Sequence, residues 1–191
     1  MPAIEYSFDA SKAKAAMAYV ISRLGSLDKI KLIKIIYLAD RAMFLKHGRP
    51  ITGDRQVAMP YGPVPSRCLD LVNGNFLNEQ SFDVLHVDDN KVLPTDATKS
   101  EAEKLDEKER TALDEVMVEH GDTPVWTLVD FVDNLPEYKR TYNNGTSTTI
   151  PYELLLELYG NQDQFRDGRA VISPAIAANM NCPFPRSDSD L

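Results

Sequence analysis

Asp40 is the acidic residue whose sequence surroundings most suggest a chemical role. On a helical wheel drawn through it, the neighbouring positions are apolar: Ile33, Ile36, Met43 and Phe44. A carboxylate among such residues is unfavourable unless it is paired or hydrogen-bonded. One interpretation is a catalytic or recognition acid. The other, which we favour, is a structural hydrogen bond to the Tyr61–Gly62 segment or to Arg67, which would make Asp40 and Arg67 structural polar residues.

A polar stripe lies on the same predicted helix. Lys34, Tyr37 and Arg41 are separated by three and four residues, which places them on one side of a helix. Tyrosine and arginine are favoured as anchors of protein interfaces. If the stripe is open to solvent, it is a candidate partner-binding surface, with Tyr61 as a further candidate. The alternative is a rim whose aliphatic stems cover the core while the polar ends reach water.

The remaining residues give little indication of metal binding or of nucleophilic catalysis. The three histidines, His47, His86 and His120, include no pair at a spacing of three or four. Cys68 and Cys182 lie far apart without a C-x-x-C motif, so neither a zinc site nor a disulfide framework is predicted. The phosphate-binding glycine motifs and the nucleophile elbow are also missing. We therefore expect no catalytic residue, no metal, no cofactor and no enzymatic activity.

Length and composition favour one globular domain. The chain has 191 residues, of which 43% are hydrophobic and 26% are charged. A formal net charge of −8 disfavours nucleic acid as a partner, because general binding to phosphates needs a positive face. No apolar run approaches the roughly 20 residues that cross a bilayer, and no secretory signal is apparent. We expect a cytoplasmic protein that does not enter membranes.

Charge is distributed unevenly along the chain. Residues 28–49 contain six basic and two acidic side chains, whereas residues 99–122 contain nine acidic and four basic ones. One interpretation is a pair of solvated helix faces. The other is a basic face and an acidic face that select partners by charge complementarity.

Two helices are predicted near the start of the chain. The first is expected over residues 10–24, with Asp9 as its cap and Gly25 as its end. The second is expected between Ser26 and Gly48, and its apolar residues spread around most of the circumference. A helix of that kind is packed on most sides. The fold class is therefore α+β and mainly α, a compact helical domain around a central buried helix.

Short elements follow this central helix. Residues 56–59 are expected to form a strand, residues 61–65 a rigid corner and residues 67–72 a short helix. A hairpin is expected over residues 82–93, with its turn at residues 88–90. The β structure should therefore be a small antiparallel sheet or hairpins.

Capping signals predict three later helices. Asp106 and Glu109 have the spacing of a capping box, and Pro124 suits the start of the next helix. The last helix is expected between Pro151 and Gly160. We divide the chain into a domain of residues 1–160 and a C-terminal extension of residues 161–191, partly disordered or packed on the domain.

Three segments of the chain form a recognisable set: Lys31–Asp40, Gly48–Ile51 and Tyr61–Val64. Together they resemble the Panacea domain of SocA-like antitoxins, a family found in bacteria and phages. The resemblance continues less sharply from Leu105 to Trp126 and extends to about Gly160. Many members carry a histidine after the tryptophan helix, followed by a proline and an aromatic residue. Residues 132–138 keep the proline and the aromatic residue but lack the histidine, so its role is not transferred.

The resemblance implies an antitoxin that binds a cognate toxin protein encoded by a neighbouring gene. Neutralisation in this family is either direct or achieved by delivering the toxin to a protease. Two alternatives stay open: a nucleic-acid-binding or phage-related regulator that uses residues 28–49, and an uncharacterised enzyme centred on Asp40, Tyr37 and Tyr61. A homo-oligomer is also compatible with the sequence.

Overall fold

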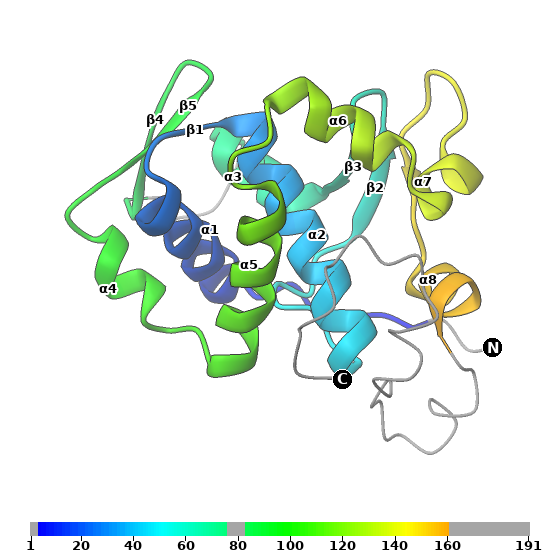
Figure 1. The fold of residues 1–191 in the computed structure, drawn as a ribbon, viewed down its shortest axis with the longest axis horizontal. Helices are drawn as coiled ribbons and strands as arrows, with labels where there is room; N and C mark the ends of the chain where they lie inside the picture. Colours follow the sequence, from blue (N-terminus) through cyan, green and yellow to red (C-terminus); the bar gives the residue numbers. More distant parts are fainter. Residues whose placement is uncertain (1–3, 76–82, 161–191) are drawn as a thin grey trace.

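The computed structural model describes residues 4–75 and 83–160, and Figure 1 shows their arrangement. The described residues form helices and two small antiparallel sheets, so the fold is α+β and mainly α. Within these ranges, none of the helices has the length and apolar character needed to span a bilayer. The predicted C-terminal extension, residues 161–191, lies outside the described residues, as does the first residue of the predicted hairpin, residue 82.

Helix α2, Lys29–His47, is the central element of the fold. Every residue from 31 to 45 is buried. Helices α1 and α5 lie on one side of α2, and the β2–β3 hairpin lies on the other (Figure 1). The predicted central buried helix is therefore confirmed.

The two N-terminal helices begin and end for different reasons. Helix α1, Ala10–Leu24, has the predicted limits, because the Asp9 carboxylate accepts a hydrogen bond from the Lys12 N–H and Gly25 follows with φ +75°. The predicted cap of α2, Ser26, is wrong. Residues 27–28 instead form the short strand β1, Leu27–Asp28, and Asp28 is the N-cap of α2.

Two three-stranded sheets flank the helices. In the first, β5 lies between β1 and β4, and in the second, β2 lies between β3 and β6. The bounds of the other five strands are β2 Gln56–Met59, β3 Gly62–Pro65, β4 Leu85–Asp88, β5 Lys91–Pro94 and β6 Thr148–Thr149. The predicted corner at residues 61–65 is thus mostly a strand, since residues 62–65 pair with β2. Proline is tolerated there because β3 is an edge strand.

Six further helices complete the described fold: α3 Ser66–Asn73, α4 Thr98–Ala102, α5 Glu107–His120, α6 Val125–Asp133, α7 Pro136–Thr141 and α8 Tyr152–Tyr159. The capping box at the start of α5 is present, with Asp106 accepting from the Glu109 N–H and the Glu109 carboxylate accepting from the Asp106 N–H. Helices α4 and α7 were not predicted, since five and six residues are too short to show helical periodicity.

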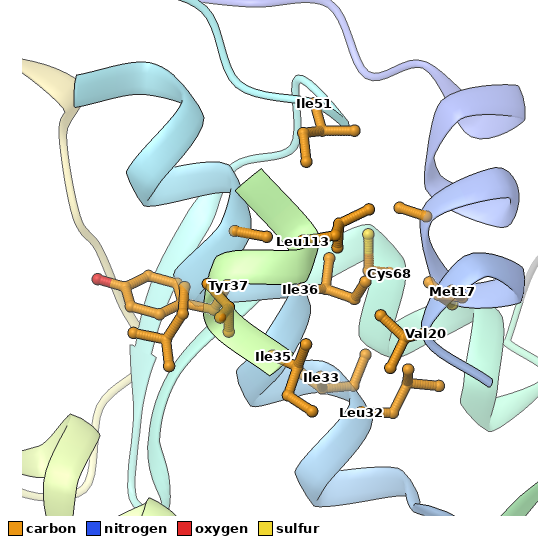
Figure 2. Close-up of a cluster of buried hydrophobic side chains, with 14 of the residues drawn as sticks. Met17, Val20, Leu32, Ile33, Ile35, Ile36, Tyr37, Ile51, Cys68 and Leu113 are labelled. Atoms are coloured by element: carbon orange, nitrogen blue, oxygen red, sulfur yellow. The ribbon is translucent and has the colours of Figure 1, made fainter. Parts of the chain in front are cut away.

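The main apolar core lies where α1, α2, α3 and α5 meet. Figure 2 shows Met17 and Val20 of α1 facing the isoleucines of α2, with Leu113 of α5 beside them. Cys68 of α3 is fully buried in the same cluster, and burial raises the pKa of its thiol well above its usual value. Tyr37 lies on the other side of α2, with its hydroxyl directed away from this cluster (Figure 2).

Candidate functional site

The polar stripe of α2 lies inside the domain. Lys34, Tyr37 and Arg41 are 2%, 0% and 2% exposed, respectively. They therefore form neither the solvent-open surface that direct partner binding requires nor a rim with solvated ends. Residues from β3, α6, α7 and α8 supply their surroundings, and the three helices lie more than 80 positions further along the chain.

Glu137 of α7 is the shared partner of Tyr37 and Arg41. Its Oε1 accepts hydrogen bonds from Arg41 Nε at 2.6 Å and from the Tyr37 hydroxyl at 3.2 Å. The Tyr159 hydroxyl donates to its Oε2 at 2.7 Å, and the Arg41 guanidinium lies over the Tyr159 ring at 4.5 Å. Burial raises the pKa of Tyr37, with the charge of Glu137 adding to the effect. The Tyr37 phenol therefore stays protonated and acts as a donor that joins α7 to α2, while Tyr159 joins α8 to the same carboxylate.

Lys34 instead fixes the β2–β3 hairpin. Its Nζ donates to the Pro63 carbonyl oxygen at 2.9 Å, and the Tyr138 hydroxyl donates to the Met59 carbonyl oxygen at 2.8 Å. Burial lowers the pKa of Lys34 to about 7, although the charge of Asp133 opposes this change. The two bonds hold both strands of the hairpin next to its two-residue loop.

Gly62 brings the hairpin close to α6. It has φ +89°, and a Cβ built on it would lie 2.6 Å from Asp133 Oδ1 and 2.9 Å from Lys34 Nζ. A side chain at this position would force Asp133 Oδ1, Lys34 Nζ or the hairpin itself to shift. The absence of a Cβ at Gly62 therefore lets the loop that carries Tyr61 lie close to α6.

Tyr61 and Trp126 form an exposed aromatic pair. Their side chains are 64% and 60% exposed, and their ring centroids are 6.1 Å apart in an edge-to-face arrangement. Trp126, in the first turn of α6, was not among the predicted site residues. Most residues of α6 are apolar, so the sequence alone does not show which of them face outward, and the fold places the Trp126 side chain at the surface. Together they are the surface feature best suited to anchoring another protein.

Asp40 binds the loop that follows α2. Its Oδ1 accepts from the backbone N–H groups of Ile51 and Thr52 at 2.8 and 2.9 Å, and its Oδ2 accepts from the Thr52 hydroxyl and from Gln56 Nε2. Burial raises the pKa of Asp40 to about 7, against hydrogen bonds from Thr52 that lower it. The predicted partners were wrong: Tyr61 is at the surface, and exposed Arg67 lies over the ring of Phe8.

The structure does not bring together the three residues of the enzyme alternative. Asp40 faces the loop at residues 51–56, Tyr37 bonds to Glu137, and Tyr61 contacts Trp126 at the surface. Nor do residues 4–75 and 83–160 contain a group of three or more His, Cys, Asp or Glu side chains suited to a metal ion. Among the described residues, Asp40, Tyr37 and Tyr61 therefore do not form a common site.

The basic and acidic segments of the chain pair with each other. Arg49 at the end of α2 contacts Asp106 at 2.7 Å and Glu109 at 2.9 Å, and Lys46 is paired with Glu115 of α5. Lys46 and Arg49 are therefore paired with acidic residues of the same domain, while their side chains stay 35% and 43% exposed. A nucleic acid that binds residues 28–49 would have to compete with acidic residues of α5 for Lys46 and Arg49.

Comparison with protein families gave one match. The model of the family described as "Antitoxin SocA-like, Panacea domain" matches residues 32–139, which include both Tyr61 and Trp126. Neither the curated proteins nor the solved structures gave a match.

Proposed function

The chain belongs to the family of SocA-like antitoxins with a Panacea domain, and from this premise we propose that it neutralises a cognate toxin protein by binding it directly. The observation that carries the proposal is the family match, which spans more than half of the chain. The toxin is expected to be encoded by an adjacent gene and to meet its antitoxin in the cytoplasm.

The exposed aromatic pair supports action by binding. Large aromatic side chains supply most of the binding energy of many protein interfaces, because they bury a wide area at a small loss of conformational freedom. Tyr61 and Trp126 are two of the three large hydrophobic residues exposed among the described residues, and they lie in contact. By contrast, Lys34, Tyr37 and Arg41 would contribute indirectly, by holding the elements that carry this pair.

Co-expression with the neighbouring open reading frame tests the proposal. We expect the neighbour alone to arrest growth and this chain to restore it, whereas a version of its gene with an early stop codon should not. The toxin should co-purify with the chain, and its amount in the cell should not fall. A harmless neighbour, or one that stays toxic, contradicts the proposal. Restored growth with a falling amount of toxin would instead indicate delivery to a protease.

A further inference from the structure

The exposed face of α6 combines aromatic rings with a carboxylate. Trp126 and Asp130 are both exposed and four residues apart in this helix, which places them on the same side of it. Tyr61 contacts Trp126 from the hairpin loop. We name Tyr61, Trp126 and Asp130 the aromatic–acidic patch.

Hydrogen bonds and close packing anchor the backbone that carries the patch. Lys34 and Tyr138 donate to carbonyl oxygens on the two strands of the hairpin, and Gly62 allows the hairpin to lie against Val132 and Asp133. Trp126 lies within the regular backbone of a helix. Side chains mounted in this way lose little freedom on binding, so more of the contact energy is expressed as affinity.

The charge of the patch selects its partner. Asp130 makes no ion pair with any described residue, and Asp122, just before α6, is a second exposed carboxylate. Two buried lysines of α2 lie on the inner side of these carboxylates: Lys31 donates to the Gly121 carbonyl oxygen and interacts electrostatically with Asp122, and Lys34 directs its Nζ to the Pro63 carbonyl oxygen. Aromatic faces and a carboxylate both attract a cation. The phosphates of a nucleic acid would be repelled, although bases could stack on the rings.

We propose that the aromatic–acidic patch is the toxin-binding site, and that it takes a cationic side chain of the toxin, arginine or lysine. This inference rests on the proposed antitoxin function. The cation packs against the rings of Tyr61 and Trp126, and its charge is balanced by Asp130. The net charge of −8 adds a long-range attraction for such a basic surface.

Binding of the purified toxin by isothermal titration calorimetry tests the proposal. Trp126→Ala and Tyr61→Ala should each weaken the toxin Kd by at least about thirty-fold, as at interface hot spots. Asp130→Lys should weaken binding further, and the affinity of the wild-type chain should fall as salt is added. The matched control is Glu103→Lys, because Glu103 is also exposed and follows α4, at the other end of the molecule from α6 (Figure 1).

The result for each variant counts only if its thermal unfolding midpoint matches that of the wild type. Toxin binding that is equally strong in the wild-type chain and in all three patch variants overturns the proposal, while the antitoxin function stands. If the wild-type chain neither binds nor neutralises the toxin, the proposed antitoxin function itself is contradicted. A dimer that is lost in the patch variants, with toxin binding unchanged, would assign the patch to self-association and also overturn the proposal.

A second measurement does not depend on substitution. The chain contains one tryptophan, so fluorotryptophan labelling places a single fluorine signal at Trp126. This signal should shift when unlabelled toxin is added, and solvent quenching of Trp126 should decrease. An unchanged signal in a saturated complex would place the toxin elsewhere and overturn the proposal.

Discussion

Glu137 accepts a hydrogen bond from Arg41 at 2.6 Å, and neither side chain reaches solvent, with exposures of 0% and 1%. The two residues are separated by 96 positions in the sequence. The pair therefore joins α7 to the central helix, and Tyr159 extends the connection to α8 through the same carboxylate. Removal of the Arg41–Glu137 pair should therefore weaken the packing of α7 and α8 on α2.

Glu137→Gln should destabilise the protein by about 3–5 kcal/mol, because the charge of Arg41 would stay buried without its counterion. The measurement is the free energy of unfolding in urea. Glu157→Gln is the matched control, since Arg140 and Glu157 form a 2.9 Å ion pair with exposures of 52% and 53%. This exposed pair should contribute less than about 1 kcal/mol. Equal losses of unfolding free energy in the two variants would contradict the expected difference between the buried and the exposed ion pair.

Gly62→Ala should destabilise the protein more than Gly145→Ala. Both glycines have a left-handed backbone, with φ +89° and +86°, but a Cβ at Gly145 meets nothing within 4 Å. The backbone conformation alone should cost about 1–2 kcal/mol at each site. The contacts with Asp133 and Lys34 should add about 1–3 kcal/mol at Gly62 only. Thermal and urea unfolding of the two variants measure this difference, and similar losses would show that the hairpin or the side-chain ends of Asp133 and Lys34 can shift to make room for the Cβ.

Lys34 should make the stability of the protein depend on pH above neutrality. Its pKa is about 7 in the folded state and near its usual value of about 10.4 in the unfolded chain. Between these values the unfolded chain binds a proton that the folded protein does not, so this residue's contribution to stability increases as pH rises. Below pH 7 both states are protonated and the contribution is constant.

Lys34→Met isolates this contribution. The difference in unfolding free energy between the wild-type protein and the variant should shift in favour of the wild type from pH 7 to pH 10. Lys139→Met, on the exposed side of α7, is the control and should show no such trend. A flat difference for Lys34→Met would mean that the Lys34 ammonium is as well solvated in the folded protein as in the unfolded chain.

Asp40→Asn should cost little, whereas Asp40→Ala should cost about 3 kcal/mol. The asparagine oxygen can still accept from the N–H groups of Ile51 and Thr52. Its amide would face Gln56 Nε2, and rotation of the Gln56 amide group would bring Oε1, which is buried without a partner among the described residues, into position to accept from it. Alanine leaves both backbone N–H groups buried and unpaired. Urea unfolding measures the two losses.

The same variants address the enzyme alternative. Because Asp40 holds a loop in this structure, Asp40→Asn should still restore growth when it is co-expressed with the toxin. Loss of neutralisation in an Asp40→Asn protein that folds normally would point to a chemical role for this carboxylate.

Local sequence signals predicted those helix limits that are set by hydrogen bonds between nearby residues. The limits of α1 follow from Asp9 and Gly25, and the start of α5 follows from the Asp106–Glu109 capping box. The burial of α2 could also be predicted, because its apolar residues surround the helix. Each of these features depends on residues within a few positions of one another.

The environment of the polar residues could not be predicted in this way. Arg41 is buried because Glu137 lies opposite it, and Trp126 is exposed although its helix is apolar. The cap at Asp28 depends on the pairing of β1 with β5, some 60 positions further along the chain. These properties depend on how distant segments pack, and helical periodicity contains no information about that packing.

The fold extends beyond the segment that defines the family. Residues 32–139 begin inside α2 and omit α1, whose residues from Ala15 to Ala18 have no exposed surface (Figure 1). They also omit Tyr159 and the strand β6. A fragment trimmed to the matched residues would thus start without the first turn of α2 and expose the apolar surface that α1 covers. Expression of such a fragment should yield aggregates, and the smallest workable unit for binding studies has to include the flanking helices.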